Sequence, residues 1–126
     1  MSNQIFGSVQ ETAPQTLAKA LAIKLTGGGM SIGIPKESTF QENRVPLTPA
    51  AVKFFTSNGH RILIESAAGH NANFSDHQYS EAGAEISNDT FAVFQCDTIL
   101  KIDPPTSKEI DLMKSGQLLI SALQIN

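Results

Sequence analysis

Residues 32–49, IGIPKESTFQENRVPLTP, decide how this chain folds. The mainly apolar residues Ser31 to Ile34 predict a short strand, and Pro35 with the charged residues after it predicts a loop. The loop ends at Thr48, whose side-chain oxygen can accept a hydrogen bond from a helix N-terminus. Pro49 follows, and proline is favoured at the first helical position. The stretch therefore predicts a strand, a loop and a helix start, the repeating unit of an α/β protein.

The loop of this unit presents an arginine, Arg44, near two glutamates, Glu37 and Glu42. Ligands of α/β proteins are usually held on the loops that follow the strands. The guanidinium group offers a rigid fork of donors that can bind a carboxylate through two hydrogen bonds, which a lysine ammonium cannot do. An arginine on a loop is usually only hydrated. Arg44 is nevertheless a candidate, because other polar residues accompany it at the same edge.

Length and composition are those of one globular domain. The chain has 126 residues, of which 40% are hydrophobic and 17% are charged, and its net charge is −3. A chain of this size can bury a core of its own. Its lysines and arginines are scattered, which argues against nucleic acid as a partner.

The lack of a recognisable targeting signal and the single cysteine favour a cytoplasmic location. The N-terminus lacks the basic start and apolar core of a secretory signal, and no apolar run approaches the roughly 20 residues of a membrane span. Cys96 is the only cysteine, so an internal disulfide and a multi-cysteine metal site are excluded. We therefore expect a cytoplasmic protein.

The first 30 residues are interpreted as a helical leader. Residues 14–25, PQTLAKALAIKL, have apolar positions 17, 21 and 25 near one face of a helix. The sequence TGGG at 26–29 ends this pattern. We therefore expect an N-terminal helix and a Gly-rich linker in residues 1–30, followed by a domain that spans residues 31–126.

From residue 31 onward, predicted strands alternate with predicted helices. The strands are expected at 31–34, 61–65, 84–86, 98–102 and 117–121, and the helices at 49–57, 75–83, 89–95 and 106–114. Strands that are separated by helices pair in parallel through right-handed crossovers. The prediction is an α/β three-layer sandwich with a mainly parallel, flavodoxin- or Rossmann-like sheet, preceded by the N-terminal helix. The chain ends just after a strand, so we expect it to be part of a larger protein.

The polar residues at the carboxyl ends of the strands are the candidates for function, because substrates bind at that edge of a parallel sheet. Lys36, Glu37 and Arg44 follow the first strand, Lys101 ends the fourth, and Gln124 follows the fifth. Donors from Arg44, Lys101 and Gln124 predict a pocket for a small anionic or keto acid. Lys101 is the sharper candidate, because a lysine inside an apolar strand loses hydration unless it is paired or faces a cleft. The alternative is an edge-strand lysine whose ammonium reaches solvent.

Other chemistries find little support in the sequence. His60, His70 and His77 have no metal-ligand spacing and are interpreted as surface histidines. The glycines at 27–29 precede a strand instead of following one, so they do not form a dinucleotide-binding fingerprint. Cys96 follows a predicted helix and is interpreted as a buried, unreactive residue. We therefore expect neither a metal site nor cofactor-binding residues in this chain.

Several segments, in this order, carry a resemblance to a known family: IGIPKE, ENRVPLTP, NGHRILIESAAGHNANFSD, YSEAGAEI and DTILKIDPP. Together they resemble the N-terminal domain of the alanine dehydrogenase and NAD(P) transhydrogenase alpha-subunit family. The resemblance runs from about residue 31 to the C-terminus, about three-quarters of the chain. It implies a two-domain parent in which an NAD-binding Rossmann domain, absent from this chain, follows the present C-terminus.

The resemblance also implies roles for the candidate residues. In alanine dehydrogenases the arginine of the ENRV motif and the lysine of the LK motif hold pyruvate or alanine, and these are Arg44 and Lys101 here. The family's catalytic histidine lies in a YLH motif, and Gln124, in ALQ, occupies its place. Glutamine can donate a hydrogen bond to a carbonyl, but it cannot transfer a proton near neutral pH. The expected catalytic residues are Lys101 and Gln124, and the expected substrate-binding residues are Arg44 and Lys101.

Three functions remain open at this point. The favoured one is the substrate-binding domain of an NAD-dependent alanine dehydrogenase, which converts L-alanine, NAD and water to pyruvate, ammonia and NADH. The second is the nucleotide-binding component of a proton-translocating NAD(P) transhydrogenase with a membrane partner, and Gln124 in place of histidine motivates it. The third is a non-catalytic module that senses a small acid. The isolated chain is expected to be inactive because NAD binds mainly to the absent domain, and the resemblance implies a homo-oligomer.

Overall fold

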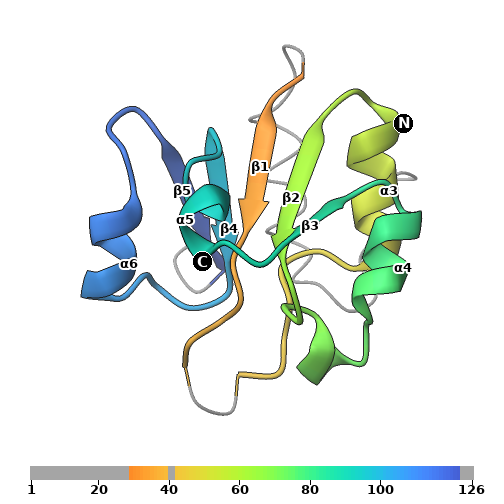
Figure 1. The fold of residues 1–126 in the computed structure, drawn as a ribbon, viewed down its shortest axis with the longest axis horizontal. Coiled ribbons are helices and arrows are strands. Elements are labelled where there is room, and N and C mark those ends of the chain that lie inside the picture. Colours follow the sequence, from red (N-terminus) through yellow and green to blue (C-terminus); the bar gives the residue numbers. More distant parts are fainter. Residues whose placement is uncertain (1–28, 40–41, 123–126) are drawn as a thin grey trace.

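A single sheet of five parallel strands organises the chain (Figure 1). The structure, a computed structural model, describes residues 29–39 and 42–122. The strands are β1 (Ser31–Ile34), β2 (Arg61–Glu65), β3 (Glu85–Ser87), β4 (Thr98–Lys101) and β5 (Leu118–Ser121), in the order β3-β2-β1-β4-β5. The helix expected at 14–25 lies outside the described residues.

Four α-helices connect these strands, and each begins at a side chain that caps its N-terminus. They are α3 (Pro49–Ser57), α4 (Asp76–Glu81), α5 (Thr90–Val93) and α6 (Ser107–Leu112), and a short 3-10 helix, η1, spans His70–Ala72. Thr48, Ser75, Asp89 and Thr106 accept the capping hydrogen bonds. The predicted elements from residue 31 onward are all present, and their ends differ from the prediction by one or two residues at most.

Two hydrophobic clusters cover the two faces of the sheet, because successive strand residues point to opposite sides. The larger cluster joins Ile32, Ile62 and Leu100 to buried residues of α3 and α4. The smaller cluster packs Ile99 against Phe94 and against partly buried residues near α6. Figure 1 shows α3 and α4 at one side of the sheet and α5 and α6 at the other. The predicted three-layer α/β sandwich is therefore confirmed.

The strand order reverses at β1, and this reversal sets the position of the site. The chain builds β2 and β3 on one side of β1 and then crosses over to add β4 and β5 on the other. β1 and β4 pair directly, with Ile32 opposite Thr98 and Gly33 opposite Ile99. The loops that leave the carboxyl ends of β1 and β4 therefore diverge at a topological switch point, where ligands bind in open α/β sheets.

The interpretation of the histidines is wrong for His60. Its ring is buried, 8% exposed, and Nδ1 accepts a hydrogen bond from the backbone N–H of Met30 at 3.3 Å. The turn after α3 folds the chain back, so the ring lies against Phe55, with the ring centroids 6.2 Å apart. His70 and His77 are exposed, as predicted.

Cys96 is buried, as predicted, and this burial raises the pKa of its thiol. In the part of the chain that the structure describes, no helix is both long and apolar enough to cross a membrane. The same residues contain no group of three or more His, Cys, Asp or Glu side chains that could hold a metal ion.

Gly33 allows α5 to end directly over the centre of the sheet. A Cβ atom at this position would collide with the carbonyl oxygen of Val93 and would approach Cys96 and Ile99 to 3.2 Å. The neighbours are backbone and packed core atoms, which cannot move aside cheaply. A side chain at Gly33 would therefore separate α5 from β1, next to the switch point.

We predict that Gly33→Ala lowers the free energy of unfolding by about 1–3 kcal/mol, the usual cost of overpacking. The control is Gly116→Ala, where a Cβ meets nothing within 4 Å and only the positive φ of 85° opposes the change. That backbone cost is about 1–2 kcal/mol. Urea denaturation of the two variants measures both losses, and a Gly33→Ala variant more stable than the control would contradict the packing argument.

Candidate functional site

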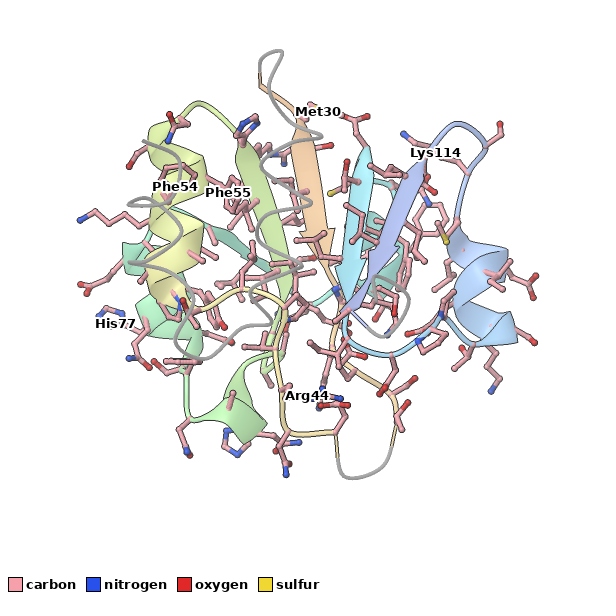
Figure 2. All side chains as sticks on the ribbon, turned by 180° about the vertical axis from the view of Figure 1, so that it is seen from behind. Met30, Arg44, Phe54, Phe55, His77 and Lys114 are labelled. Carbon is pink, nitrogen blue, oxygen red and sulfur yellow. The ribbon has the colours of Figure 1, made fainter. Side chains whose placement is uncertain are left out.

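The two predicted cations lie at the carboxyl edge of the sheet. Lys101 is the last residue of β4, and Arg44 lies on the loop between β1 and α3. Figure 2 shows Arg44 at the end of the sheet opposite Met30 and Lys114. The third predicted site residue, Gln124, lies outside the described residues.

The ammonium group of Lys101 is buried between two carboxylates. The residue is 1% exposed, and Nζ donates to Oε1 of Glu37 at 3.0 Å and to Oε2 of Glu109 at 3.3 Å. Glu37 follows β1 and Glu109 lies in α6, so the ammonium lies beside the switch point. The alternative reading of Lys101 as a solvent-reaching edge lysine is wrong, because β4 is an interior strand and its neighbours enclose the side chain.

Glu37 ties the loop after β1 to the end of β4. Besides the ammonium of Lys101, its carboxylate accepts the backbone N–H groups of Ile102 at 2.8 Å and of Asp103 at 3.4 Å. Its side chain is 5% exposed. In the sequence, Glu37 is one of several polar residues of the loop, and nothing near it indicates a role. Its position directly after the first strand was the only available signal.

Glu109 joins the start of α6 to Lys101. Oε1 accepts the backbone N–H of Thr106 at 2.9 Å and completes the capping box, while Oε2 accepts from Lys101. The capping box can be predicted from the sequence, because Thr106 and Glu109 are three residues apart. The ion pair between Glu109 and Lys101 cannot be predicted in this way, because nothing local to α6 reveals which strand lies beneath it.

Arg44 is held in a fixed orientation by Glu42. Nε donates to Oε2 of Glu42 at 2.9 Å and Nη2 donates to Oε1 at 3.0 Å, so the carboxylate occupies the side of the guanidinium. The arginine side chain is 51% exposed, and no acceptor for Nη1 lies among residues 29–39 and 42–122. Since a guanidinium has five N–H donors, its outer end remains available to a second carboxylate.

The ion pair between Arg44 and Glu42 also shifts the pKa of both groups. The hydrogen bonds from Arg44 lower the pKa of the Glu42 carboxyl below its ordinary value, against an opposing effect of burial. The hydrogen bond to Glu42 raises the pKa of the Arg44 guanidinium in turn. Both groups are therefore charged across the physiological range.

The chain next to Arg44 is anchored in the core. Val45 and Leu47 are buried, 3% and 0% exposed, and the hydroxyl of Tyr79 donates to the carbonyl oxygen of Leu47 at 2.8 Å. Burial raises the pKa of the Tyr79 hydroxyl, which keeps it a donor. The arginine therefore projects from a fixed segment although its own side chain is half exposed.

A pocket of about 120 Å³ lies in front of Arg44. It is lined by Lys36, Glu37, Glu42, Arg44, Ala67, Ala68, His70 and Asn71. This volume is well below the roughly 300–1,000 Å³ of sites for drug-sized ligands, so the pocket suits a small acid better than a nucleotide. Lys101 does not line it, because Glu37 stands between the pocket and the ammonium.

The two predicted cations therefore belong to one edge but not to one open cavity. Arg44 faces the pocket, and Lys101 lies behind the carboxylate of Glu37, which contributes to both. The fold and this edge define an open parallel α/β domain with a small, charged pocket beside the switch point of its sheet.

Comparison with known proteins places this domain in a family. The profile of the family described as "Alanine dehydrogenase/PNT, N-terminal domain" matches residues 33–126. The chain therefore belongs to the alanine dehydrogenase/PNT family, over the N-terminal domain of that family.

Two curated relatives show the extent of the similarity. The alanine dehydrogenase of Bacillus subtilis (strain 168) is 40% identical over 96 residues, which are 76% of this chain and 25% of that protein. The alanine dehydrogenase of Methanococcus maripaludis is 41% identical over 97 residues, 76% of this chain and 26% of the relative. The chain thus spans about a quarter of the length of these relatives.

Solved structures confirm the fold. An L-alanine dehydrogenase superposes with a TM-score of 0.68 at 37% identity, covering 73% of this chain and 26% of that one. A transhydrogenase from Sinorhizobium meliloti superposes with a TM-score of 0.67 at 34% identity, covering 72% and 27%. The family resemblance predicted from the sequence is therefore confirmed.

We predict that Arg44→Met raises the pKa of the Glu42 carboxyl, because it removes the main cause of its lowering. In the unsubstituted chain the ion pair stabilises the fold above the unfolded-state pKa of a glutamate, about 4.3. This contribution is lost as the pH falls through the lowered pKa of the folded state. NMR titration of the Glu42 carboxyl carbon between about pH 2 and pH 7 measures the shift.

The matched control is Arg61→Met. Arg61 pairs with Glu85 at the other end of the sheet and lowers the pKa of that carboxyl in the same way. This substitution should raise the pKa of Glu85 and leave that of Glu42 unchanged. A Glu42 titration that is the same with and without Arg44 would show that the pair does not form in solution.

Proposed function

We propose that residues 31–126 are the substrate-binding domain of an NAD-dependent alanine dehydrogenase, which converts L-alanine to pyruvate and ammonia. The observation that carries the proposal is the geometry of Arg44: Glu42 holds the side of its guanidinium, and the outer end remains available at a small pocket. The similarity of the same residues to proteins named alanine dehydrogenase supports this choice of substrate.

Arg44 binds the carboxylate of alanine or pyruvate in this proposal. Two roughly parallel N–H donors at the outer end of the guanidinium match the two oxygens of a carboxylate, and both hydrogen bonds are strengthened by charge. Glu42 prevents the arginine from turning away, so less conformational entropy is lost when the substrate binds.

Lys101 acts on the carbonyl end of the substrate. An ammonium has three N–H donors, and two of them are taken by Glu37 and Glu109 within the described residues. The donor that Glu37 releases can hydrogen-bond a substrate oxygen and stabilise negative charge that develops there. Because Glu37 separates Lys101 from the pocket, this contact requires the Glu37 side chain to turn aside when substrate enters.

The described residues do not fit NAD. The loop after β2 is the one small-residue loop among them that follows a strand, and its Gly69 serves packing: a Cβ there would lie 2.5 Å from the ring of Tyr79. We therefore assign the cofactor to a domain outside this chain and expect the chain alone to have no turnover. In the complete enzyme NAD accepts the hydride.

Gln124 would orient the substrate carbonyl by donating a hydrogen bond. It cannot transfer the proton that a histidine would transfer, so we assign that step to water or to a carboxylate outside the chain. By analogy with the family, we further propose a cytoplasmic homo-oligomer.

A second candidate is the nucleotide-binding component of a proton-translocating NAD(P) transhydrogenase. The superposition on the Sinorhizobium meliloti transhydrogenase is nearly as close as that on the L-alanine dehydrogenase, and a glutamine at position 124 suits a domain without acid–base chemistry. In this function the protein would work with a membrane partner, and the edge pocket would not need to bind alanine.

We predict that the full-length protein reduces NAD in the presence of L-alanine and that Arg44→Ala raises KM for alanine and pyruvate roughly 10- to 100-fold. This range corresponds to the loss of charge-assisted hydrogen bonds worth about 1.5–3 kcal/mol. Lys101→Ala should lower kcat. Arg61→Ala is the control, because Arg61 forms an equally short ion pair at the opposite end of the sheet. Steady-state kinetics of the four proteins measure these effects.

Unchanged kinetics in both Arg44→Ala and Lys101→Ala would refute the assignment of the site. If the full-length protein has no alanine-dependent activity, and membranes that contain it reduce an NADP analogue with NADH, the transhydrogenase function is correct instead.

A further inference from the structure

Glu109 contacts Lys101 but does not line the pocket in front of Arg44. Its carboxylate lies 3.3 Å from Nζ and is 10% exposed. Glu37, the other partner, lines that pocket and can be reached by a ligand. Of the two carboxylates on the ammonium, Glu109 is therefore the one that substrate leaves in place.

The carboxylate of Glu109 is fixed independently of Lys101. Its second oxygen accepts the backbone N–H of Thr106, and its own backbone N–H donates to the Thr106 hydroxyl at 3.2 Å. These two hydrogen bonds close the capping box at the start of α6. A buried carboxylate that is held by its own helix provides a rigid anchor for the flexible lysine side chain.

The capping box alone does not explain a glutamate at this position. Glutamine serves equally well in such boxes, and α4 of this chain shows it: Gln78 accepts the backbone N–H of Ser75 at 2.8 Å from an exposed position. In the box of α6 Thr106 is exposed as well, but Glu109 is buried and its carboxylate contacts an ammonium. At this position glutamate differs from glutamine in placing a negative charge beside the Lys101 ammonium.

We propose that Glu109 is a positioning residue for the reaction, which holds the Lys101 ammonium in place while substrate displaces Glu37. This inference rests on the proposed alanine dehydrogenase function. Lys101 alternates between two states that differ in one partner: Glu37 and Glu109 when the pocket is empty, substrate oxygen and Glu109 when it is filled. Without the charge on Glu109, the ammonium would follow Glu37 or lose its direction, and the barrier of the chemical step would rise.

The test compares Glu109→Gln, Glu109→Asp and Ser75→Ala with the unsubstituted full-length enzyme. Glu109→Gln keeps an oxygen for the Thr106 N–H and removes only the charge. We expect kcat to fall by about 10- to 100-fold, the range that follows from a misplacement of up to about 1 Å. KM for NAD should change less than about threefold, and Glu109→Asp should recover part of kcat because it keeps the charge.

Ser75→Ala controls for stability. It removes the side-chain cap of α4, on the other face of the sheet, and should lower the unfolding midpoint without changing kcat. A kcat of Glu109→Gln equal to that of the unsubstituted enzyme would overturn the proposal, as would an equal loss of kcat in Ser75→Ala. An unsubstituted enzyme without alanine-dependent turnover would refute the proposed function, and with it any role of Glu109 in that reaction.

A second measurement does not depend on turnover. In the 126-residue chain, the ¹⁵N signal of the Lys101 ammonium is expected to be observable, because the group is buried and exchanges slowly with water. Glu109→Gln should shift this signal and accelerate its exchange, whereas Ser75→Ala should leave both unchanged. An unaltered Lys101 signal in Glu109→Gln would show that Glu109 does not position the ammonium, whatever the enzyme's activity.

Discussion

The interaction on which the rest of the site depends is the burial of the Lys101 ammonium between Glu37 and Glu109. An unpaired ammonium in this position would cost several kcal/mol of desolvation. The chain avoids that cost by bringing together three separate elements: the loop after β1, the last residue of β4 and the first turn of α6. The switch point is therefore held together by charge, where the two strand ends diverge and backbone pairing stops.

Both cations of the edge follow the same plan. Arg44 and Lys101 each carry a resident carboxylate, and each has N–H donors to spare. The resident partner fixes the direction of the cation. The outer end of Arg44 faces the pocket, whereas Lys101 is covered by Glu37. With Lys36 there are three cations and three paired carboxylates at this edge, so the edge does not attract anions by net charge. In the proposed function, recognition of a small acid would then come from the direction of the donors.

Much of the fold could be predicted from the sequence, because its signals are local. The caps at Thr48, Ser75 and Thr106 mark helix starts within three residues, and the apolar run of β2 is read directly. The partners of Lys101 could not be predicted in this way. Glu37 stands 64 residues away, and it becomes a neighbour only because β4 pairs with β1, which is a property of the strand order.

The same distinction applies to Arg44 and to the pocket in front of it. Arg44 and Glu42 are two residues apart, so their pairing needs no tertiary information. That Glu37 screens Lys101 from the pocket depends on how two distant loops meet. The burial of His60 also depends on a distant residue, because its hydrogen-bond partner, Met30, lies just before β1.

In the proposed enzyme, Glu37 would control the access of substrate to Lys101. Lys101 is only 1% exposed, and the carboxylate of Glu37 contacts its ammonium at 3.0 Å. In the proposed function, substrate would bring a carboxylate to Arg44 and an oxygen to Lys101, and Glu109 would keep the ammonium paired while Glu37 turns aside. In this proposal the binding energy that Arg44 contributes would be available to move Glu37, and a ligand that lacks a carboxylate would not supply it. Selectivity for acids and access to Lys101 would thus depend on one event at this edge.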